Sequence, residues 1–330
     1  MGKKKINNAD IAIAVVTFKR QQMLQDLLNS YLNLTVFPKF IVIVDNENSA
    51  ETAKIVNNFK EEISKENVEV VYKPMEENTG GSGGFAKGAE IAYHSGAAWL
   101  WLMDDDVLVY PDSIKRIEPI LENSLEKDRR VVQPRRHNWD NSPFYWQYQF
   151  MVGLGIPNPI APSDFGETEE FKVMNTACFE GGFFHRSIVQ EIGLPDARFF
   201  IYWDDTLYGY LASKITTPIL IRDFLMKRAR EISHIPLGRV RKLNSTSDMV
   251  RYYIMRNRGY LAKYFMINGD YHRFLFGFGT ALTFVKETIR LFIDHKFRKG
   301  LKAIWKGWRD SRKILHDKDW KPVGPILSDI

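Results

Sequence analysis

The sequence predicts an α/β protein built on a mostly parallel sheet with helices on both faces. Apolar, β-branched runs alternate with amphipathic helical patterns through roughly the first hundred residues. Polar residues stand directly after these runs, where the carboxyl ends of parallel strands form a ligand-binding crevice. With 330 residues, 45% of them apolar and 26% charged, the chain can bury a large core and is not disordered as a whole.

Four apolar runs supply the expected strands of this sheet. They are short and rich in β-branched residues, as strands buried on both faces are. Helical or glycine-rich segments separate them, which predicts successive strand–helix–strand units. The expected strands span residues 11–18, 39–49, 68–74 and 97–106, and the helices between them span residues 20–33, 50–66 and the stretch from the glycine-rich loop 77–88 to Ser95.

Beyond residue 112 the regular alternation weakens. Residues 138–170 are rich in aromatic residues and proline and show no clear period. The other expected elements are a helix over 113–127 that contains Pro119, a strand over 129–135, two strands and a helix from Ser187 between 171 and 193, a helix after Asp205, and mostly helical structure from about 246 to 315.

Composition restricts the kinds of protein this chain can be. The single cysteine, Cys178, excludes an intrachain disulfide and favours a reducing compartment. The apolar stretch over residues 11–16 is too short for a signal peptide, and no 18-residue window is apolar enough to span a membrane. We therefore expect a chain without a membrane-spanning helix.

Charge is distributed unevenly along the chain. Residues 222–330 hold 24 lysines and arginines against 10 acidic residues, whereas the preceding residues hold 22 against 30. A basic second part indicates a polyanionic partner, either nucleic acid or an anionic membrane surface. No recognised motif for nucleic acid accompanies the charge, so we expect no nucleic-acid partner.

The pattern over residues 271–313 favours the membrane surface. Apolar residues recur there at helical spacing, and basic residues after position 295 alternate with Trp305 and Trp308. A basic amphipathic helix with tryptophans is typical of membrane interfaces. The alternative is a helical subdomain whose apolar stripe packs on the rest of the protein, and the two interpretations are compatible.

Three consecutive aspartates, Asp104, Asp105 and Asp106, end the fourth expected strand. No lysine or arginine lies within eight residues of them. Carboxylates grouped in this way form a hard-oxygen site for Mg²⁺ or Mn²⁺. In an extended segment Asp104 and Asp106 point one way and Asp105 the other. The alternative is an acidic turn, with Asp112 capping the next helix.

The segment "ENTGGSGGFAKG", residues 77–88, predicts a loop that approaches a ligand closely. Its glycines permit positive φ, and the amides of the following helix favour anions. It is not a phosphate-binding P-loop, because Lys87 is followed by Gly88 rather than by serine or threonine. The dinucleotide fingerprint is also absent, since "TFKRQQ" follows the first strand. A flexible linker is the alternative.

Two further aspartates, Asp204 and Asp205, follow Trp203 in "IYWDDTLYGY". A carboxylate beside aromatic rings has a raised pKa and suits a general base. Aromatic faces also suit sugar rings. The alternative is a helix N-cap, and we expect one member of the pair to cap and the other to be catalytic.

Histidine and cysteine give weaker signals. His234 in "EISHIPLGR" is either a third metal ligand or a structural histidine. Cys178 has no basic or histidine neighbour and is expected to be a small buried residue. No G-x-S-x-G motif is present, so a serine nucleophile is not indicated.

In this order the segments resemble family 2 glycosyltransferases with the GT-A fold. The matching segments, within residues 11–240, are "VVTFKR", "VDN", "NTGGSGGFAKG", "MDDD", "GGFFHRS", "FIYWDD" and "SH". The glycine-rich loop and "YWDD" look most like bacterial galactofuranosyltransferases, and related rhamnosyltransferases are similar in pattern. The resemblance implies a Rossmann-like catalytic domain over residues 1–240, with a nucleotide-sugar half to about 112 and an acceptor half from 113, and a helical, basic region over 241–330.

The resemblance also assigns roles to residues at matching positions. The donor residues are Thr17, Arg20, Asp45, Asn78, Gly80, Gly81, Asp104 and Asp105, and Asp45 faces the nucleoside. The ligands of a Mn²⁺ or Mg²⁺ cofactor are Asp104, Asp106 and His234. Asp205 is the general base with Asp204 as its neighbour, and Trp203, Gly181 and Gly182 lie near the acceptor. Leu207 departs from the family, which often has an acid there.

These residues imply an inverting transfer of a sugar from a nucleotide-diphosphate donor to a lipid-linked or glycan acceptor in cell-surface polysaccharide synthesis. UDP-galactofuranose is the first expected donor and dTDP-rhamnose the alternative. A metal-dependent nucleotidyltransferase is less favoured, because it needs a basic glycine-rich loop directly after the first strand. The retained acids oppose a non-catalytic scaffold. The expected location is cytoplasmic, peripheral on the inner face of the plasma membrane.

Overall fold

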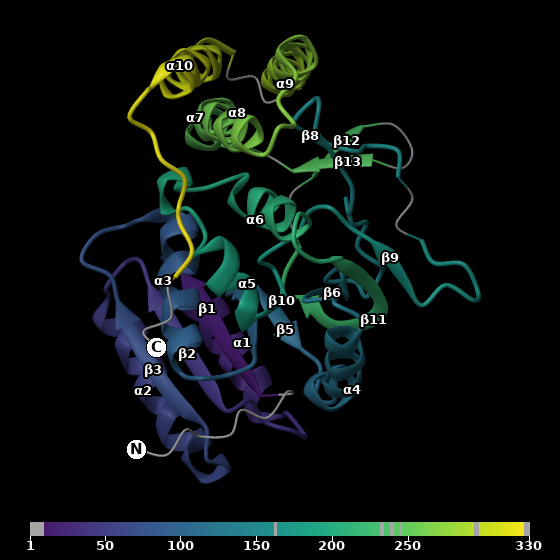
Figure 1. Ribbon diagram of the computed structural model, residues 1–330. Helices are drawn as coiled ribbons and strands as arrows, with labels where there is room; N and C mark the ends of the chain where they lie inside the picture. The colour runs from purple at the N-terminus through teal and green to yellow at the C-terminus, as the bar shows by residue number, and fades with distance from the viewer. Residues whose placement is uncertain are drawn as a thin grey trace.

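The computed structural model describes residues 10–161, 164–231, 234–237, 241–244, 246–293 and 297–326, with only the backbone for 234–237 and 241–244. Its centre is a nine-stranded sheet in the order β3-β2-β1-β4-β10-β6-β11-β5, with β9 paired to β11 (Figure 1). The strands are β1 (Ile11–Thr17), β2 (Phe40–Asp45), β3 (Glu69–Pro74), β4 (Trp99–Asp104), β5 (Val107–Val109), β6 (Val131–His137), β9 (Phe171–Val173), β10 (Gly182–His185) and β11 (Ile219–Arg228).

Helices cover both faces of this sheet. They are α1 (Gln21–Leu32), α2 (Ala50–Ile63), α3 (Gly80–His94), α4 (Ser113–Glu126), α5 (Arg186–Ile192) and α6 (Asp204–Ala212). Strands β3, β2, β1 and β4 pair in this order, and all three pairs are parallel. Strand β10 runs antiparallel to both of its neighbours, β4 and β6. The predicted α/β architecture, with a mostly parallel sheet between helices, is therefore confirmed.

Alternation along β1 divides the core into two layers. Ile11, Ile13 and Val15 join the cluster that packs on α1, α2 and α4. Ala12 and Ala14, which point the other way, join the cluster that includes residues of α3, α5 and α6. Because these alanines are small, α3 lies close to β1. The face of α3 that meets β1 therefore has little room for side chains.

Glycines remove side chains from this face of α3, and they lie in the helix and not in the loop expected from the sequence. Residues 80–84 were expected in a loop, but they form the first turns of α3. A methyl group at Gly84 would lie 2.5 Å from Cγ1 of Val16, and one at Gly88 would lie 3.2 Å from Cβ of Ala14. Close packing of helix on strand therefore explains these glycines, and a flexible linker is excluded.

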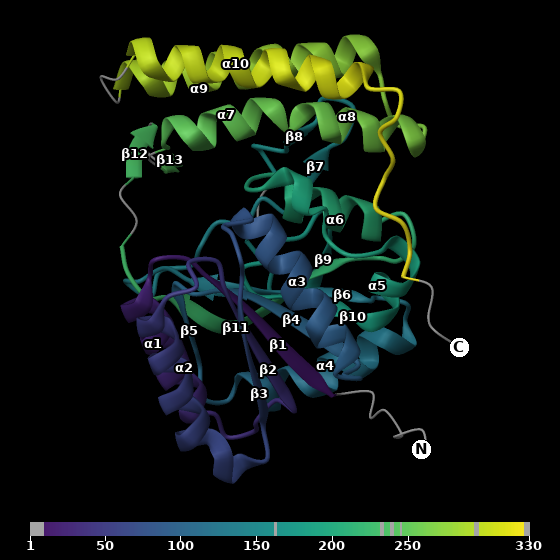
Figure 2. The same ribbon diagram turned by 90° about the vertical axis from the view of Figure 1, so that its left-hand side faces the viewer.

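The C-terminal part forms two helical layers above the sheet (Figure 2). The nearer layer holds α7 (Asp248–Arg256) and α8 (Arg258–Ile267), and the outer layer holds α9 (Arg273–Ile293) and α10 (Phe297–His316). An aromatic cluster joins them to α6 through Leu207, Tyr210, Leu261, Phe265 and Phe276. Among the described residues, no helix combines the length and apolar content that crossing a membrane requires.

Two short hairpins complete the fold. Strand β7 (Phe150–Met151) pairs with β8 (Ile156–Pro157) inside the segment that showed no period in sequence. Strand β12 (His234–Leu237) pairs with β13 (Arg241–Asn244) shortly before α7. Two-residue strands leave no periodic signal, which explains why the first hairpin could not be predicted.

Replacing Gly84 by alanine tests the packing of α3 on β1. We expect Gly84→Ala to lower the free energy of unfolding by about 1–3 kcal/mol, because the new methyl overpacks the interface. Gly81 is the matched control in the same helix, since a methyl group there meets no atom within 4 Å. Gly81→Ala should be neutral or stabilising by up to about 1 kcal/mol. Urea denaturation measures both, and equal losses would contradict the packing argument.

Candidate active site

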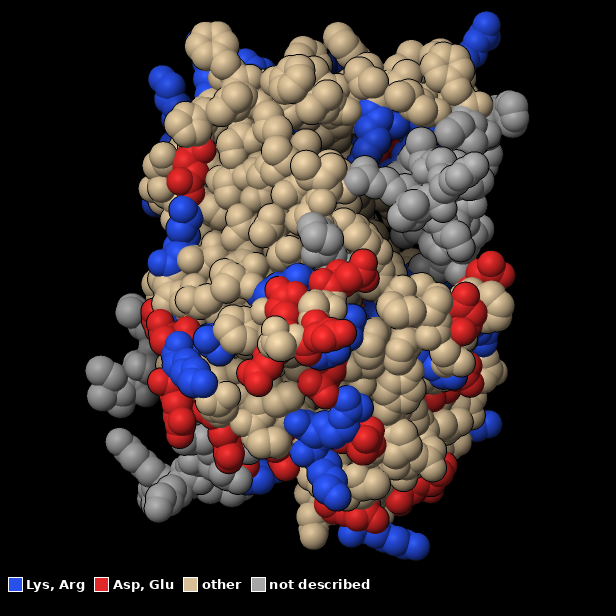
Figure 3. Space-filling model, turned by 90° about the vertical axis from the view of Figure 1, so that its right-hand side faces the viewer, with Lys and Arg blue, Asp and Glu red and all other residues tan. Residues whose placement is uncertain are grey.

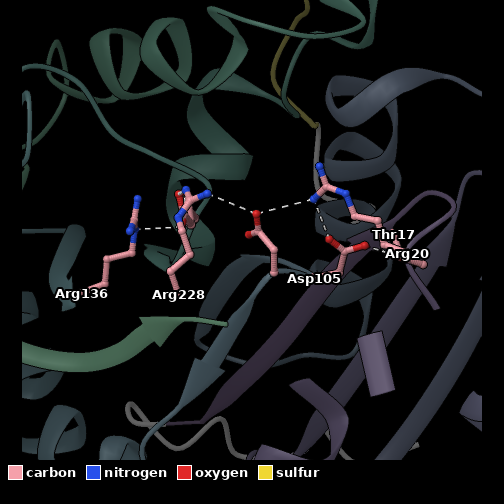
Figure 4. A network of polar contacts seen from close by, with 7 residues as sticks. Thr17, Arg20, Asp105, Arg136 and Arg228 are labelled. Atoms are coloured by element: carbon pink, nitrogen blue, oxygen red, sulfur yellow. Dashed lines mark hydrogen bonds and ion pairs between the residues drawn. The ribbon is translucent and has the colours of Figure 1, made fainter. Parts of the chain in front are cut away.

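The acidic triplet at the end of β4 is neutralised from distant parts of the chain (Figure 4). Arg20, in the turn between β1 and α1, places Nη1 2.9 Å from Oδ1 of Asp105 and 3.7 Å from Oδ2 of Asp106. Arg228, at the end of β11, places Nη1 3.3 Å from Oδ2 of Asp106. The sequence around the triplet has no lysine or arginine, so its cations come from afar: Arg20 lies 85 positions from Asp105, and Arg228 lies 122 positions from Asp106.

Asp105 points toward β1 and is a structural member of the triplet. Its carboxylate is buried and accepts hydrogen bonds from the Thr17 hydroxyl, at 2.7 Å, and from Arg20, at 2.9 Å. Burial raises the pKa of Asp105, while Arg20 and Thr17 act in the opposite direction. Asp105 thereby fixes the turn that carries Arg20, whose side chain is 49% exposed and remains accessible to a ligand.

Asp106 lies at one end of a buried ionic chain. Arg228 bridges Asp106 to Glu180, placing Nη2 3.0 Å and 2.9 Å from the two Glu180 oxygens. Arg136, which is fully buried, places Nε 2.8 Å from Glu180 Oε1. The second oxygen of Asp106, Oδ1, is buried and has no hydrogen-bond partner among the described residues.

Asp104 lies beside Asp106 and Glu180, and none of the described lysines and arginines forms an ion pair with it. Burial raises the pKa of Asp104 well above its usual range, and repulsion from Asp106 and Glu180 adds to this effect. The pairing of Gly182 with Leu102 explains the proximity, because it carries Glu180 to the end of β4. Four carboxylates, those of the triplet and of Glu180, face three arginines, Arg20, Arg136 and Arg228, so one negative charge remains uncompensated.

The uncompensated charge fits a divalent cation. Asp104 and the unpartnered oxygen of Asp106 supply the hard oxygen donors that Mn²⁺ and Mg²⁺ prefer. No group of three histidine, cysteine, aspartate or glutamate side chains arranged for a metal occurs in the part of the chain that the structure describes. The expected third ligand, His234, opens β12, but its side chain lies outside the described residues.

Asp204 and Asp205 occupy the first turn of α6, and neither is the N-cap. Trp203 holds that position, with φ 74°. Burial raises the pKa of Asp205 to about 7, and the charge of Asp204 contributes further. Burial also raises the pKa of Asp204, against which the neighbouring Ser82 hydroxyl acts. The expectation that one aspartate caps the helix is therefore wrong, because the preceding backbone turns left-handed one residue earlier.

Cys178 connects this aspartate pair with the acidic triplet. The Cys178 thiol lowers the pKa of the Asp205 carboxyl, against the larger effect of burial. Burial raises the pKa of the Cys178 thiol, and Asp205, Glu180 and Asp104 add to the rise. Asp104 and Asp205, about a hundred residues apart, both raise the pKa of this one thiol, which indicates that they lie in the same region of the protein.

The segment before Asp204 is held in a strained backbone. Phe200, Tyr202 and Trp203 have φ values of 64°, 76° and 74°, a region that bulky residues rarely adopt. The Asn257 side-chain amide, which is fully buried, donates to the carbonyls of Phe199, Ile201 and Tyr202 at 3.0, 2.9 and 2.8 Å. The junction of α7 and α8 thus fixes the segment that carries Asp204 and Asp205.

The start of α3 packs on the same segment. Gly80 has φ 71°, and a methyl group there would overlap the carbonyl of Phe200. The amide of Ser82 donates to that carbonyl at 3.0 Å. Asn78 accepts from the Gly80 amide at 2.9 Å, and Asn46 donates to the Gly80 carbonyl at 3.0 Å. Gly80, Gly81 and Asn78 therefore lie next to the aspartate pair.

Asp45 ends β2 beside Thr17 but is fully buried. Its oxygens accept from the amides of Glu47 and Ser49, at 2.9 and 3.0 Å, and from the hydroxyl of Tyr72, at 2.8 Å. These internal bonds shape the loop after β2. A nucleoside contact by Asp45 stays a prediction.

The three residues expected near the acceptor are also buried. The Trp203 indole donates to the Ile254 carbonyl at 3.0 Å. Gly181, with φ 91°, donates to the Leu102 carbonyl at 2.8 Å, and Gly182 pairs with Leu102 across the sheet. Their acceptor role stays a prediction, and the structure gives each of them a role in shaping the site.

Five residues of this site were not singled out as site residues from the sequence. Arg228, Glu180 and Arg136 form the ionic chain, Cys178 contacts the base candidate, and Asn257 holds the strained segment. An isolated charge in a strand or an asparagine between two helices carries no local signal. The position of Glu180 directly before two glycines was the one usable hint.

The fold is that of GT-A glycosyltransferases. The S. aureus TarS fragment 1–349 is 13% identical with TM-score 0.50, over 92% of this chain and 91% of that chain. The mannosyltransferase PcManGT from Pyrobaculum calidifontis, solved in complex with GDP-Man and Mn²⁺, is 11% identical with TM-score 0.52, over 94% and 88%. Residues 12–193 match the model of "Glycosyl transferase family 2", and the chain belongs to this family.

Two similar curated proteins are galactofuranosyltransferases. Galactofuranosyltransferase GlfT1 of Mycolicibacterium smegmatis is 24% identical over 76% of this chain and 82% of its own length. GlfT1 of Mycobacterium tuberculosis (strain H37Rv) is 26% identical over 75% and 80%. The resemblance predicted from sequence is confirmed at the level of the family and the fold.

Replacing Asn257 tests how the strained segment is held. We expect Asn257→Ala to lower the free energy of unfolding by about 2–4 kcal/mol, because the carbonyls of Phe199, Ile201 and Tyr202 each lose a buried side-chain donor. Asn268 is the matched control at the other end of α8, where its amide donates only to the Tyr264 carbonyl of its own helix. Asn268→Ala should cost less than about 1 kcal/mol in urea denaturation. Similar losses for both variants would refute a special role for Asn257.

Proposed function

We propose that the protein transfers a sugar from a nucleotide-diphosphate donor to an acceptor hydroxyl with inversion at the anomeric carbon. One observation carries the proposal: Asp205, with a pKa of about 7, shares a site with Asp104 and Asp106 across the thiol of Cys178. A base of this pKa is half ionised near neutral pH, where it accepts a proton effectively. No second nucleophilic carboxylate is needed for inversion.

Asp104 and Asp106 are the residues proposed to hold Mn²⁺ or Mg²⁺, with His234 as the third ligand. When bound, the cation neutralises charge on the donor diphosphate. Two proteins of the same fold, PcManGT and GalNAc-T7, were solved with Mn²⁺, which supports a divalent cation here. The unpartnered oxygen of Asp106 supports the same assignment.

The residues around the triplet bind and orient the donor. Arg20, half exposed above Asp105 and Asp106, pairs with the diphosphate. Thr17 and Asp105 hold the turn that carries Arg20. The start of α3 supplies the backbone amide of Gly81 to the donor, and Asn78 holds this turn by accepting from the amide of Gly80. Asp45 holds the loop at the nucleoside end.

The transfer itself depends on the aspartate pair. Asp205 takes the proton of the acceptor hydroxyl as that oxygen bonds to the anomeric carbon. The bond from the anomeric carbon to the diphosphate breaks, and the nucleoside diphosphate leaves with its electron pair. Asp204 keeps the pKa of Asp205 high through its own charge. The acceptor enters beside the segment before α6, over Trp203 and the turn at Gly181 and Gly182.

UDP-galactofuranose is the proposed donor, and a lipid-linked or cell-surface glycan is the proposed acceptor. The similarity to the two GlfT1 proteins supports this choice. A dTDP-rhamnose donor is the second candidate. A nucleotidyltransferase is disfavoured by the turn after β1, which holds Arg20 against Asp105 instead of forming a glycine-rich phosphate loop.

The outer helical layer supports association with an anionic membrane surface, which would place the protein on the inner face of the plasma membrane. The α9 helix exposes a stripe of large apolar side chains, and the neighbouring α10 is rich in exposed lysine and arginine. Such a combination favours an interfacial location without a membrane-spanning helix.

Substituting the proposed base tests the proposed function. We expect Asp205→Asn to lower kcat by about 10²–10⁴, since a general base contributes this much, and to leave nucleotide-sugar affinity nearly unchanged. Release of UDP from UDP-galactofuranose, or of dTDP from dTDP-rhamnose, measures activity with Mn²⁺ present, and calorimetry with UDP measures binding. Asp112→Asn, at the start of α4 and outside the site, is the control with full activity. Near-normal turnover by Asp205→Asn would exclude this base.

Cys178 offers a test through pH. Because Asp205 must be ionised to act, wild-type kcat should fall as the pH drops below about 7. The thiol lowers the pKa of Asp205, so Cys178→Ala should move this limb to higher pH, by on the order of half a unit. Cys178→Ser, with a stronger hydroxyl donor, should move it to lower pH. If the fall of kcat at low pH occurs at the same pH in both variants, the group that titrates is not Asp205.

A further inference from the structure

Three of the C-terminal helices enclose a groove that the transfer reaction does not use. Residues of α8 form its floor, and residues of α9 and α10 form its walls. Its volume is about 670 Å³, within the range of small-molecule sites. None of the residues assigned to donor, metal, base or acceptor lines it.

The groove is apolar, and its charged residues are all cationic. Its apolar lining includes Ala262, Phe276, Ala281, Phe284, Val285 and Trp305. The charged residues in the lining are Arg258, Arg273 and Arg312, and no carboxylate is among them. An apolar cavity with basic residues at its edge selects a ligand that combines a hydrocarbon part with an anion.

Two of the three arginines are accessible to such an anion. Arg258 is buried and donates to the carbonyls of Gly155 and Leu154, at 2.7 and 2.8 Å, so it forms part of the wall. Arg273 and Arg312 are exposed. Within the described part of the chain, no ion pair joins either of them to a carboxylate.

The groove opens beside the exposed apolar stripe of α9. The stripe consists of Phe274, Phe278, Leu282, Val285, Ile289 and Phe292, all exposed on one side of the helix. Val285 belongs to both stripe and groove. Figure 3 shows the upper part of this face as mostly uncharged, with lysine and arginine at its corners and in one patch on its right half, and an acidic patch at its left edge. A hydrocarbon chain in contact with the stripe can therefore reach the groove at Val285.

Charge on α10 indicates which surface meets the stripe. Its exposed basic residues are Arg298, Lys299, Lys302, Lys306, Arg309, Arg312 and Lys313. Each lysine or arginine near an anionic bilayer contributes about 1 kcal/mol of attraction. A second copy of this chain would bring the same positive charge and be repelled. The charge therefore favours an anionic lipid as the occupant.

We propose that the groove between α8, α9 and α10 binds the hydrocarbon chain of an anionic lipid, with Arg273 and Arg312 at its phosphate. This inference deepens the membrane association proposed above and holds independently of the sugar transferred. The bound chain anchors the outer helical layer in one orientation, so that the protein lies on the bilayer with α9 facing the lipid.

Monomeric amphiphiles separate a lipid site from general adsorption to a bilayer. Dodecyl phosphate below its micelle concentration carries both the chain and the anion. We expect it to bind saturably, one per protein, and to change the fluorescence of Trp305 and Trp308, which line the groove. Inorganic phosphate alone should not bind, and uncharged dodecyl maltoside should bind about tenfold more weakly.

Variants assign the binding to this groove. Ala281→Trp, which fills the groove from α9, should abolish saturable binding. The double variant Arg273→Gln and Arg312→Gln should reduce the affinity for dodecyl phosphate about tenfold and leave that for dodecyl maltoside unchanged. Phe274, 90% exposed on α9 and outside the groove, is the matched control. Phe274→Ser should bind dodecyl phosphate normally and sediment less with phosphatidylglycerol vesicles.

Three outcomes would overturn the inference. They are non-saturable binding of dodecyl phosphate, equal binding by Ala281→Trp, and a dimer in light scattering that Ala281→Trp dissociates, because the occupant would then be a second copy. If the protein binds vesicles but does not bind monomeric dodecyl phosphate, the membrane association stands and the lipid site in the groove is wrong. Circular dichroism confirms that each variant is folded. Loss of UDP release in the transfer assay bears on the proposed function alone.

Discussion

The repulsion among three adjacent carboxylates at the end of β4, one buried and two partly buried, is the constraint on which the rest of the site depends. Charges this close, removed from water, destabilise the fold unless cations or hydrogen bonds offset them. Arg20 and Arg228 supply the cations, and Thr17 supplies a hydrogen bond to Asp105. Arg20 comes from the turn after β1, and Arg228 comes from the end of β11. The triplet therefore meets both arginines only when the whole sheet is assembled.

The arginines do not neutralise the triplet completely. The negative charge that remains is what allows the site to bind a cation. Arg228 is shared between Asp106 and Glu180, so Asp104 has no cation within contact distance in the described structure. An ordinary core would not retain such a group, since an unpaired buried charge is costly. The cost becomes acceptable where a cation or a charged ligand completes the balance, and such sites are where strongly shifted pKa values gather.

Local patterns predicted those parts of the structure that local physics determines. The apolar runs of β1 to β4 follow from strand geometry. The expected alternation of Asp104, Asp105 and Asp106 does not apply, because β4 ends at Asp104 and the next two aspartates lie in the turn before β5. The partners of the triplet could not be predicted, because antiparallel pairing of β10 and β11 brings them from more than seventy residues away. The first turns of α3 were mistaken for a loop because glycines disfavour helices in isolation, whereas here their lack of side chains permits contact with β1.

Two adjacent residues at the start of α8 show how the helical layers and the catalytic segment depend on each other. Asn257 holds the carbonyls of the strained segment before Asp204, while Arg258 holds α9 through Thr280 and the β7–β8 hairpin through Leu154 and Gly155. One helix end therefore fixes the proposed base on one side and the floor of the groove on the other. A displacement of α8 would alter both together, since packed helices move as rigid elements. The helical layers are accordingly part of the machinery that positions Asp205, whatever surface α9 and α10 meet.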